Sequence, residues 1–290
     1  MNTSSSPKAF SFSAFFKIIR SDNLMMMAFA QIMTAYFLVE KQTNGQPIIS
    51  DYNLYLLILS TVIIAAAGYI INDYYDVKID YINKPDEVIV GKGMRRRMVM
   101  FLHTVLNFAG IGIACIVSLK IGLIHFIAAF ILWLYSNSLK RLPFVGNLAV
   151  AFLTGLAIWI IGFYYQRSEM LVLTYAIFAF FINLIREIIK DIEDREGDRK
   201  HGCKTLPIVL GFRATKNIIF IIAAIFVLAI LIVAYKVNNP LLYIYFGALG
   251  ILFFLFMYKI YYADRKSHFS QLSKLSKLLM LTGVISMAFL

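Results

Sequence analysis

Apolar residues dominate nine stretches of the chain, and short polar segments separate them. We place these stretches at 24–39, 52–71, 98–119, 121–135, 144–165, 170–189, 218–235, 240–262 and 278–290. Most approach or reach the 17–25 residues, roughly, that a helix needs to cross a bilayer. The fourth and ninth are short and little separates the third from the fourth, so the pattern fits eight or nine spans. Because lipid offers the backbone no hydrogen-bond partner, each span is expected to be a helix.

The composition supports a membrane protein, since 60% of the residues are hydrophobic and 15% are charged. Soluble chains are about half apolar and about a quarter charged. We therefore expect an all-α, polytopic membrane protein with a single domain over residues 1–290 and a bundle of about nine transmembrane helices. Before the first span, the segment 10–20 combines phenylalanines with Lys17 and Arg20. This pattern predicts a helix that lies in the membrane interface within residues 1–23.

The positive charges predict the orientation of the spans. With nine spans and the N-terminus inside, only Lys41, Lys120, Arg167 and Lys236 of the 28 Lys and Arg fall outside. Since cytoplasmic loops carry the excess of Lys and Arg, the N-terminus is expected in the cytoplasm. Topology and anionic headgroups then account for the net charge of +12, and neither a nucleic acid nor an obligate protein partner is inferred.

Acidic residues gather at the cytoplasmic ends of two spans. Of the 16 Asp and Glu residues, 11 lie in the segments 73–87 and 187–198. Carboxylates crowded in this way repel one another unless cations hold them. We name these segments the first and the second acidic segment.

Helical spacing separates the acids into those that share a face and those that do not. In the first acidic segment, Asn72, Asp76 and Asp80 would lie on one face of a helix. In the second, Asp191, Asp194 and Asp198 would do the same. Glu193 and Glu196 point elsewhere and are expected to be solvated. Oxygen donors on two helices suit Mg²⁺, which completes its shell with water and substrate phosphate. Zinc is disfavoured because no His or Cys accompanies these acids.

The alternative for each segment is a set of ordinary interfacial acids that balance neighbouring Lys and Arg. Two segments on one side with helical spacing favour the metal site, since ionisable groups at membrane depth are commonly functional. Basic residues stand close by in the sequence, Lys140 and Arg141 after the fourth span and Arg186 and Lys190 before the second acidic segment. Cations and a metal together can stabilise a departing diphosphate.

The two acidic segments resemble the paired motifs of the UbiA superfamily of intramembrane prenyltransferases. The first reads Asn-Asp-x-x-Asp-x-x-x-Asp at 72–80, and the second spans 191–198. The likeness extends to Arg20 and Asn23 before the first span and to 135–141 after the fourth. The segment 186–207 is most similar to the archaeal-type branch, which transfers geranylgeranyl groups to geranylgeranylglycerol phosphate.

This resemblance implies roles for individual residues. The ligands of Mg²⁺ would be Asn72, Asp73, Asp76, Asp80, Asp191, Asp194 and Asp198. The substrates would be bound by Arg20, Asn23, Tyr135, Lys140, Arg141, Arg186 and Lys190. Asp76, Asp191 and Lys140 would be the catalytic residues. Loss of diphosphate would leave an allylic cation, which an aromatic face such as Tyr69 or Tyr135 could stabilise by about 0.5–2 kcal/mol.

The implied activity is that of a Mg²⁺-dependent transferase of alkyl or aryl groups other than methyl. It would move a prenyl group, geranylgeranyl in the favoured case, from a prenyl diphosphate to geranylgeranylglycerol phosphate or a similar lipid precursor. Its partners would be these two substrates and membrane lipids. We expect an integral protein of a prokaryotic cell membrane whose site opens to the cytoplasm.

Two alternatives stay open at this point. The family usually has a second Arg-Pro after 83–85, whereas this chain has Asp86 and Glu87, so Lys92 or one of 95–97 would have to supply the missing cation. That departure leaves room for an aromatic acceptor in quinone or pigment synthesis. A cation-coupled transporter is the alternative of another class, although transporter sites lie near the bilayer midplane.

Overall fold

A computed structural model describes residues 11–39, 47–167 and 169–289, and within these ranges the chain forms helices and no β-strand. The α-helices are α1 (Phe12–Ile18), α2 (Ser21–Met33), α3 (Tyr52–Asn83), α4 (Arg96–Val117), α5 (Leu119–Asn137), α6 (Val145–Tyr165), α7 (Glu169–Glu193), α8 (Arg195–Lys200), α9 (Leu206–Val209), α10 (Gly211–Val237), α11 (Pro240–Tyr262) and α12 (Lys266–Ile285). Shorter or wider turns form η1 (Thr34–Val39), η3 (Ile48–Ser50), η4 (Leu139–Arg141) and η5 (Ser286–Phe289). The expected all-α class is confirmed.

Nine helical segments of the described ranges are long and apolar enough to cross a membrane. These are α2 with η1, the run from α3 to α7, and α10, α11 and α12 with η5. They match the nine predicted stretches one for one, which favours nine spans over eight. Ser118 separates the third from the fourth: its extended backbone ends α4, and its side chain accepts a hydrogen bond from the Lys120 amide at the start of α5.

The predicted start of the ninth span is wrong. Polar residues over 266–277 resemble a loop, so the span was expected to begin at 278, yet α12 already begins at Lys266. Phe269, Leu272 and Ser276 recur at helical spacing and are buried. A helix with one buried face can therefore begin in a segment whose average composition is polar.

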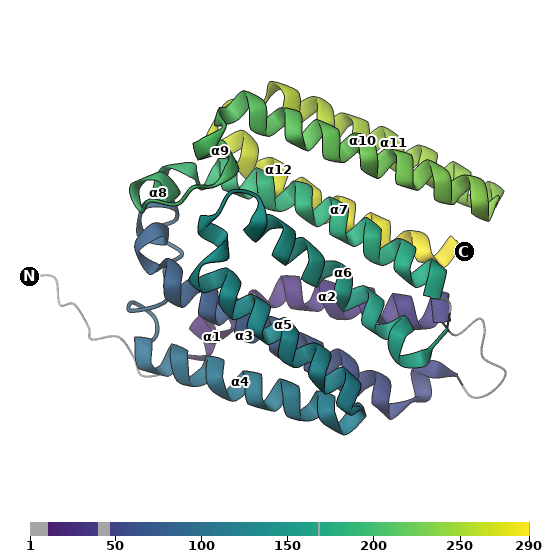
Figure 1. Cartoon of the computed structure of the whole chain (residues 1–290), viewed down its shortest axis with the longest axis horizontal. Coiled ribbons are helices and arrows are strands. Elements are labelled where there is room, and N and C mark those ends of the chain that lie inside the picture. The colour runs from purple at the N-terminus through teal and green to yellow at the C-terminus, as the bar shows by residue number, and fades with distance from the viewer. Residues whose placement is uncertain (1–10, 40–46, 168, 290) are drawn as a thin grey trace, which may run out of the picture.

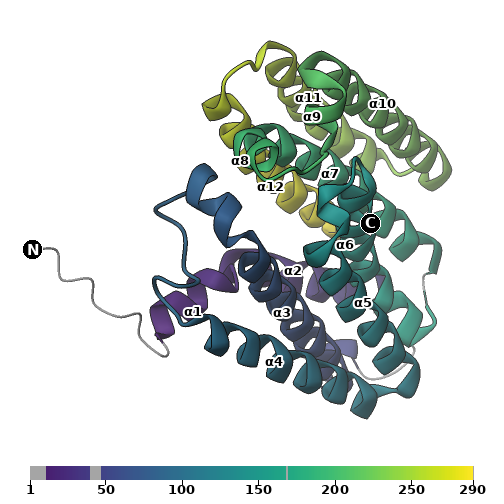
Figure 2. The ribbon, with the colours of Figure 1, turned by 60° about the vertical axis from the view of Figure 1, so that its left-hand side comes forward.

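The long helices run side by side and form layers (Figure 1). α10 and α11 lie at one edge, α7 and α12 come next, and α6 and α2 separate them from α3, α4 and α5. The view turned by 60° keeps α10 and α11 apart from α3 and α4 (Figure 2). The short helices α8 and α9 lie at one end of the bundle, which we call the polar end because the second acidic segment reaches it.

Large apolar side chains are exposed around the bundle, as expected of a surface that faces lipid. Phe108 on α4 has 76% of its surface exposed, and Phe254 on α11 has 69% exposed. Contiguous apolar area of this kind is unfavourable in water and favourable in a bilayer. The chain is an integral, multi-pass membrane protein.

A short amphipathic helix precedes the first span. In α1, Phe12 and Phe16 are exposed, whereas Ile18 is buried against the bundle. The predicted interfacial segment thus contains a helix, although residues 1–10 lie outside the described ranges. The chain turns at Arg20, which adopts a left-handed backbone with φ 53°. For a residue other than glycine this conformation costs about 1–2 kcal/mol.

Candidate active site

One side chain at the end of α3 holds the second acidic segment in place. The Nδ2 group of buried Asn83 donates to the backbone oxygen of Asp194 at 2.9 Å, and its Oδ1 accepts from the Gly197 amide at 2.9 Å. Lys266 Nζ, at the start of α12, donates to the Asn83 backbone oxygen at 2.9 Å. The two acidic segments, distant in sequence, therefore meet at the polar end.

Gly197 allows this close approach. A Cβ atom at Gly197 would lie 2.5 Å from Asn83 Nδ2 and 2.7 Å from Asn83 Oδ1. The amide of Asn83 could move aside only by giving up its two hydrogen bonds to the second acidic segment. The glycine is thus required by packing, since the backbone at Gly197 has no positive φ.

We expect Gly197→Ala to lower the free energy of unfolding by about 1–3 kcal/mol, because the added methyl group overpacks a closed contact. Thermal unfolding of the purified protein measures this change. Gly112→Ala on α4 is the matched control: no atom lies within 4 Å of its added Cβ, and alanine favours a helix by up to about 1 kcal/mol. Equal midpoints for the two variants would contradict the packing argument.

The first acidic segment is paired with cations from other elements. Arg20 Nη2 contacts Asp73 Oδ1 at 3.0 Å, and its guanidinium lies 4.9 Å from the ring centre of Tyr69. Asn23 Nδ2 donates to the Tyr69 hydroxyl at 3.2 Å. These contacts offset the cost of the left-handed backbone at Arg20, and strained residues often mark functional sites.

Lys140 reaches the first acidic segment from η4. Its Nζ forms an ion pair with Asp76 Oδ1, and only about a tenth of each side chain is exposed, 10% for Lys140 and 14% for Asp76. The backbone folds tightly here, because a Cβ at Gly146 would lie 2.8 Å from the Cα of Lys140. Arg141, also expected at the site, is exposed, and its backbone oxygen accepts from the Lys204 amide at 2.8 Å.

The second acidic segment is bent, which corrects the prediction that its acids share one helix face. α7 ends at Glu193, Asp194 lies at a bend, and Asp198 belongs to α8. Asp191 Oδ2 accepts from Asn147 Nδ2 at 2.9 Å, and Asp194 Oδ1 contacts Lys84 Nζ at 3.1 Å. The two segments nevertheless meet, because the bend directs α8 toward the end of α3 (Figure 1).

The expectation for the two glutamates is half correct. Glu196 is exposed and pairs with Lys200 at 3.0 Å, as expected of a solvated acid. Glu193 is buried, contrary to expectation. The reason is the same bend, because α7 ends at Glu193 and the chain folds back there rather than continuing outward.

The donor atoms at the polar end suit a hard cation. Asn72 Oδ1 is buried and has no hydrogen-bond partner in the described part of the chain. Burial, followed by repulsion from the charges of Asp194 and Asp76, raises the pKa of Asp198 to about 7, so a bound cation would favour the ionised form of this carboxyl. Among the described residues no three His, Cys, Asp or Glu side chains are already arranged around a common ion position. The carboxylates instead contact Lys and Arg, and those ion pairs would have to open to admit a metal.

A cavity of about 660 Å³ extends from the polar end into the bundle. Its lining includes Asn72, the residue before Asp73, and Lys190, the residue before Asp191. Most of the remaining wall is apolar. Of the predicted substrate-binding residues, the cavity is also lined by Arg20, Asn23, Tyr135 and Arg186. An apolar cavity beneath a polar, charged end can hold an amphiphile with an anionic head and a long apolar chain.

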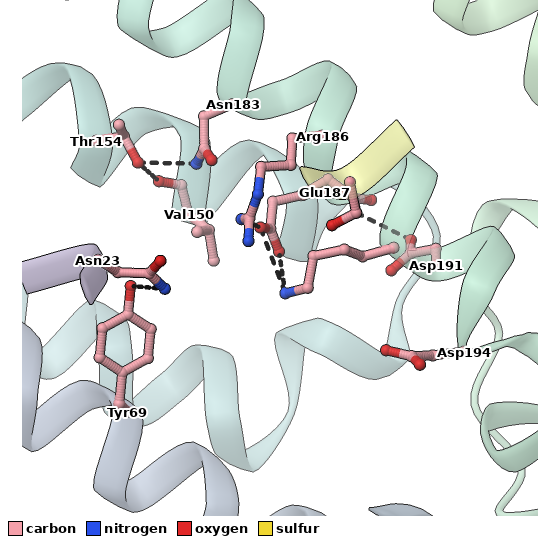
Figure 3. A network of polar contacts seen from close by, with 12 residues as sticks. Asn23, Tyr69, Val150, Thr154, Asn183, Arg186, Glu187, Asp191 and Asp194 are labelled. Carbon is pink, nitrogen blue, oxygen red and sulfur yellow. Dashed lines mark hydrogen bonds and ion pairs between the residues drawn. The ribbon is translucent and has the colours of Figure 1, made fainter. Parts of the chain in front are cut away.

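Polar side chains from α2, α3, α6 and α7 face this cavity (Figure 3). Arg186 Nη1 contacts Glu187 Oε1 at 2.6 Å, and Lys190 Nζ contacts Glu187 Oε2 at 3.3 Å. Figure 3 shows Asn23 and Tyr69 across from Arg186 and Glu187, with Asp191 farther along α7 and Asp194 at the bend that follows it. One carboxylate thus serves two cations, which leaves positive charge in excess.

The acid at the departure from the family pattern, Glu87, is exposed. The cations considered as substitutes, Lys92 and residues 95–97, do not line the cavity. Lys92 is exposed and its Nζ donates to the Pro85 backbone oxygen at 2.9 Å, and Arg96 lies over the ring of Tyr74 at 4.7 Å.

Sequence reasoning missed three polar residues of the site: Asn83, Asn147 and Lys277. Asn83 lies in the polar segment after the second apolar stretch and Asn147 near the start of the fifth, where polar residues are common, so no pattern sets them apart. Lys277 precedes the apolar stretch 278–290, so composition alone places it in a loop. A period-3.6 pattern over 266–276 would have placed it within a helix.

Comparisons with known proteins agree with this geometry. Residues 28–278 match the UbiA prenyltransferase family. The digeranylgeranylglyceryl phosphate synthase of Methanosphaera stadtmanae is 32% identical over 285 residues, which cover 94% of this chain and 97% of that protein. The synthase of the same name from Thermococcus gammatolerans is 37% identical over 200 residues, 69% of this chain and 70% of that protein.

Solved structures share the fold. A UbiA homologue from Archaeoglobus fulgidus, bound to DMAPP and Mg²⁺, superimposes with a TM-score of 0.64 at 15% identity, covering 95% of this chain and 99% of that one. The family match and the curated relatives confirm the resemblance to the UbiA superfamily. The chain belongs to the UbiA prenyltransferase family.

Proposed function

We propose that the protein transfers a prenyl group, geranylgeranyl in the favoured case, from a prenyl diphosphate to the hydroxyl group of geranylgeranylglycerol phosphate or a similar lipid precursor. The observation that carries this proposal is the placement of paired carboxylates and cations at the end of an apolar cavity of about 660 Å³. The names of the two curated relatives support a glyceryl phosphate acceptor.

Mg²⁺ is the metal that the oxygen donors fit, and the homologue from A. fulgidus was solved with Mg²⁺ and DMAPP. It would be held by Asn72, Asp73, Asp76, Asp80, Asp191, Asp194 and Asp198. When bound, Mg²⁺ neutralises phosphate oxygens and stabilises the leaving diphosphate. The unpartnered Asn72 Oδ1 and the crowded carboxylates are the features of this chain that fit such an ion.

The residues of the chain then orient and stabilise the reacting groups. Lys140 would exchange its ion pair with Asp76 for a phosphate oxygen of the donor as the metal site fills. The bond between the allylic carbon and the diphosphate oxygen breaks, and the electron pair stays on diphosphate. Tyr69 and Tyr135, which line the cavity, are placed to stabilise the positive carbon with their ring faces. The acceptor hydroxyl oxygen then bonds to that carbon, and its proton passes to the released diphosphate or to water.

The polar end is proposed to face the cytoplasm. The short loops at this end carry most of the Lys and Arg residues, and such loops stay on the cytoplasmic side of a membrane. The prenyl diphosphate would then reach the carboxylates from the cytoplasm while its chain enters the apolar cavity. A prokaryotic cell membrane is the proposed location, in keeping with the archaeal sources of the relatives.

An acceptor panel tests the proposed function. Purified protein in lipid vesicles receives radiolabelled geranylgeranyl diphosphate, Mg²⁺ and one of geranylgeranylglycerol phosphate, an aromatic hydroxy acid or glycerol phosphate. We expect label to appear in the lipid phosphate product, and only when Mg²⁺ is present. Transfer to the aromatic acid alone would show that the acceptor is wrong, and ion uptake without transfer to any acceptor would favour a transporter.

A further inference from the structure

Lys277 places an additional cation in the wall of the cavity. It lies on α12, is half-buried, and lines the cavity together with Arg186 and Lys190 of α7. Within the described part of the chain its Nζ has no ion-pair or hydrogen-bond partner. A lysine inside a membrane bundle is costly without a counter-charge, so an unpaired one here is a candidate for binding an anion.

The charges along this wall do not balance. The cavity is lined by four cations, Arg20, Arg186, Lys190 and Lys277, while Glu187 is the one acidic residue among the described residues that line it. Glu187 is shared by Arg186 and Lys190, and Arg20 pairs with Asp73 outside the wall. Asp22 attracts Lys277 from the exposed surface of α2 without forming an ion pair with it. Two positive charges are thus left over inside the cavity, which matches the charge of a phosphate monoester.

This cationic group differs in kind from the acidic segments. Asp76, Asp80, Asp194 and Asp198 do not line the cavity, and such carboxylates bind a phosphate only through a metal ion. Arg186, Lys190 and Lys277 can contact phosphate oxygens directly. The site therefore offers one place for a metal-bound diphosphate and a second place for a phosphate that needs no metal.

The apolar wall also continues on two sides of α7. On one side Gly68, Leu132 and Ile64 of α3 and α5 line the cavity, and on the other side Phe226, Phe253 and Met280 of α10, α11 and α12 do so. Figure 2 shows these two groups of helices on opposite sides of the bundle. Lys277 stands one turn from Met280, at the charged end of the second side. Two apolar walls suit two isoprenoid chains, one of the donor and one of the acceptor.

We infer that Arg186, Lys190 and Lys277 bind the phosphate monoester headgroup of the acceptor lipid, with the acceptor chain along α10, α11 and α12. This inference deepens the proposed function and rests on it. Lys277 is thereby a residue that determines acceptor specificity, and the metal-bound diphosphate of the donor lies apart from it.

The test separates the acceptor from the donor. In Lys277→Gln and in Lys277→Met, KM for geranylgeranylglycerol phosphate is expected to rise at least tenfold, while KM for geranylgeranyl diphosphate stays within twofold. Lys274→Gln is the matched control, because Lys274 is exposed on the same helix and should leave both constants unchanged. Lys277→Arg should restore most of the acceptor affinity.

A second measurement uses the acceptor that lacks its phosphate, geranylgeranylglycerol. The wild-type protein should prefer the phosphate form at least tenfold in kcat/KM, and this preference should shrink toward unity in Lys277→Gln. An unchanged preference, or an equal rise of KM for the donor, overturns the inference while leaving the proposed function intact. Absence of transfer to the lipid phosphate by the wild-type protein overturns both.

Discussion

Replacement of Asp76 or Asp191 with asparagine is expected to lower the rate of prenyl transfer at least about 100-fold. Each substitution removes one negative charge with almost no change of side-chain volume. Asp76 lies on α3 and Asp191 on α7, so the two variants change different sides of the polar end. Mg²⁺ binds carboxylate oxygens far better than amide oxygens when it must also neutralise a diphosphate. A factor of 100 corresponds to about 2.7 kcal/mol of transition-state stabilisation.

Two comparisons distinguish a catalytic effect from unfolding. Glu196→Gln removes a neighbouring acid that is exposed and paired with Lys200, so transfer should stay within about twofold of the wild-type rate. Thermal unfolding midpoints of all three variants should lie close to that of the wild type in the absence of Mg²⁺. Equal activity of Asp76→Asn and Glu196→Gln would show that Asp76 has no part in the reaction.

Lys140 and its neighbour in sequence should differ sharply. We expect Lys140→Gln to lower kcat/KM for the prenyl diphosphate about 10- to 100-fold, since a hydrogen bond to a charged group contributes about 1.5–3 kcal/mol. Arg141→Gln should change kcat/KM less than about twofold, because Arg141 is exposed at the surface while Lys140 reaches Asp76. Steady-state kinetics with varied donor concentration measure both effects.

The resemblance to the family implies that Lys140 and Arg141 both bind substrate, so this pair also tests the structure. Comparable losses in the two variants would mean that η4 rearranges when substrate binds and brings Arg141 inward. A loss confined to Arg141→Gln would contradict the placement of Lys140 beside Asp76.

Helix positions were largely predictable because each span is an apolar stretch of bilayer length. The failure at α12 has a physical reason: Phe269, Leu272 and Ser276 are buried along one face, so spacing rather than average hydrophobicity determines where this helix begins. A window that averages composition does not detect such a face. Average composition therefore places Lys277 in a loop, whereas it lies within α12.

The sequence predicts that two acidic segments lie at one end of the bundle. It does not predict which side chains contact one another there. Spacing correctly placed Asn72, Asp76 and Asp80 on the continuous helix α3. It failed for the second segment, because nothing in residues 191–198 signals that α7 ends at Glu193. The contact that joins the segments, between Asn83 and Gly197, links residues far apart in sequence and leaves no local pattern.

Both acidic segments together should hold Mg²⁺ and the diphosphate of the donor at the end of the apolar cavity. Calorimetric titration with a thiolo analogue of geranylgeranyl diphosphate, whose carbon–sulfur bond resists cleavage to the allylic cation, measures this binding without turnover. The wild-type protein should bind the analogue at least tenfold more tightly with Mg²⁺ than with EDTA, and both Asp76→Asn and Asp191→Asn should abolish that difference. Equal affinity with Mg²⁺ and EDTA in the wild-type protein, or a full Mg²⁺ effect in either variant, would contradict the claim.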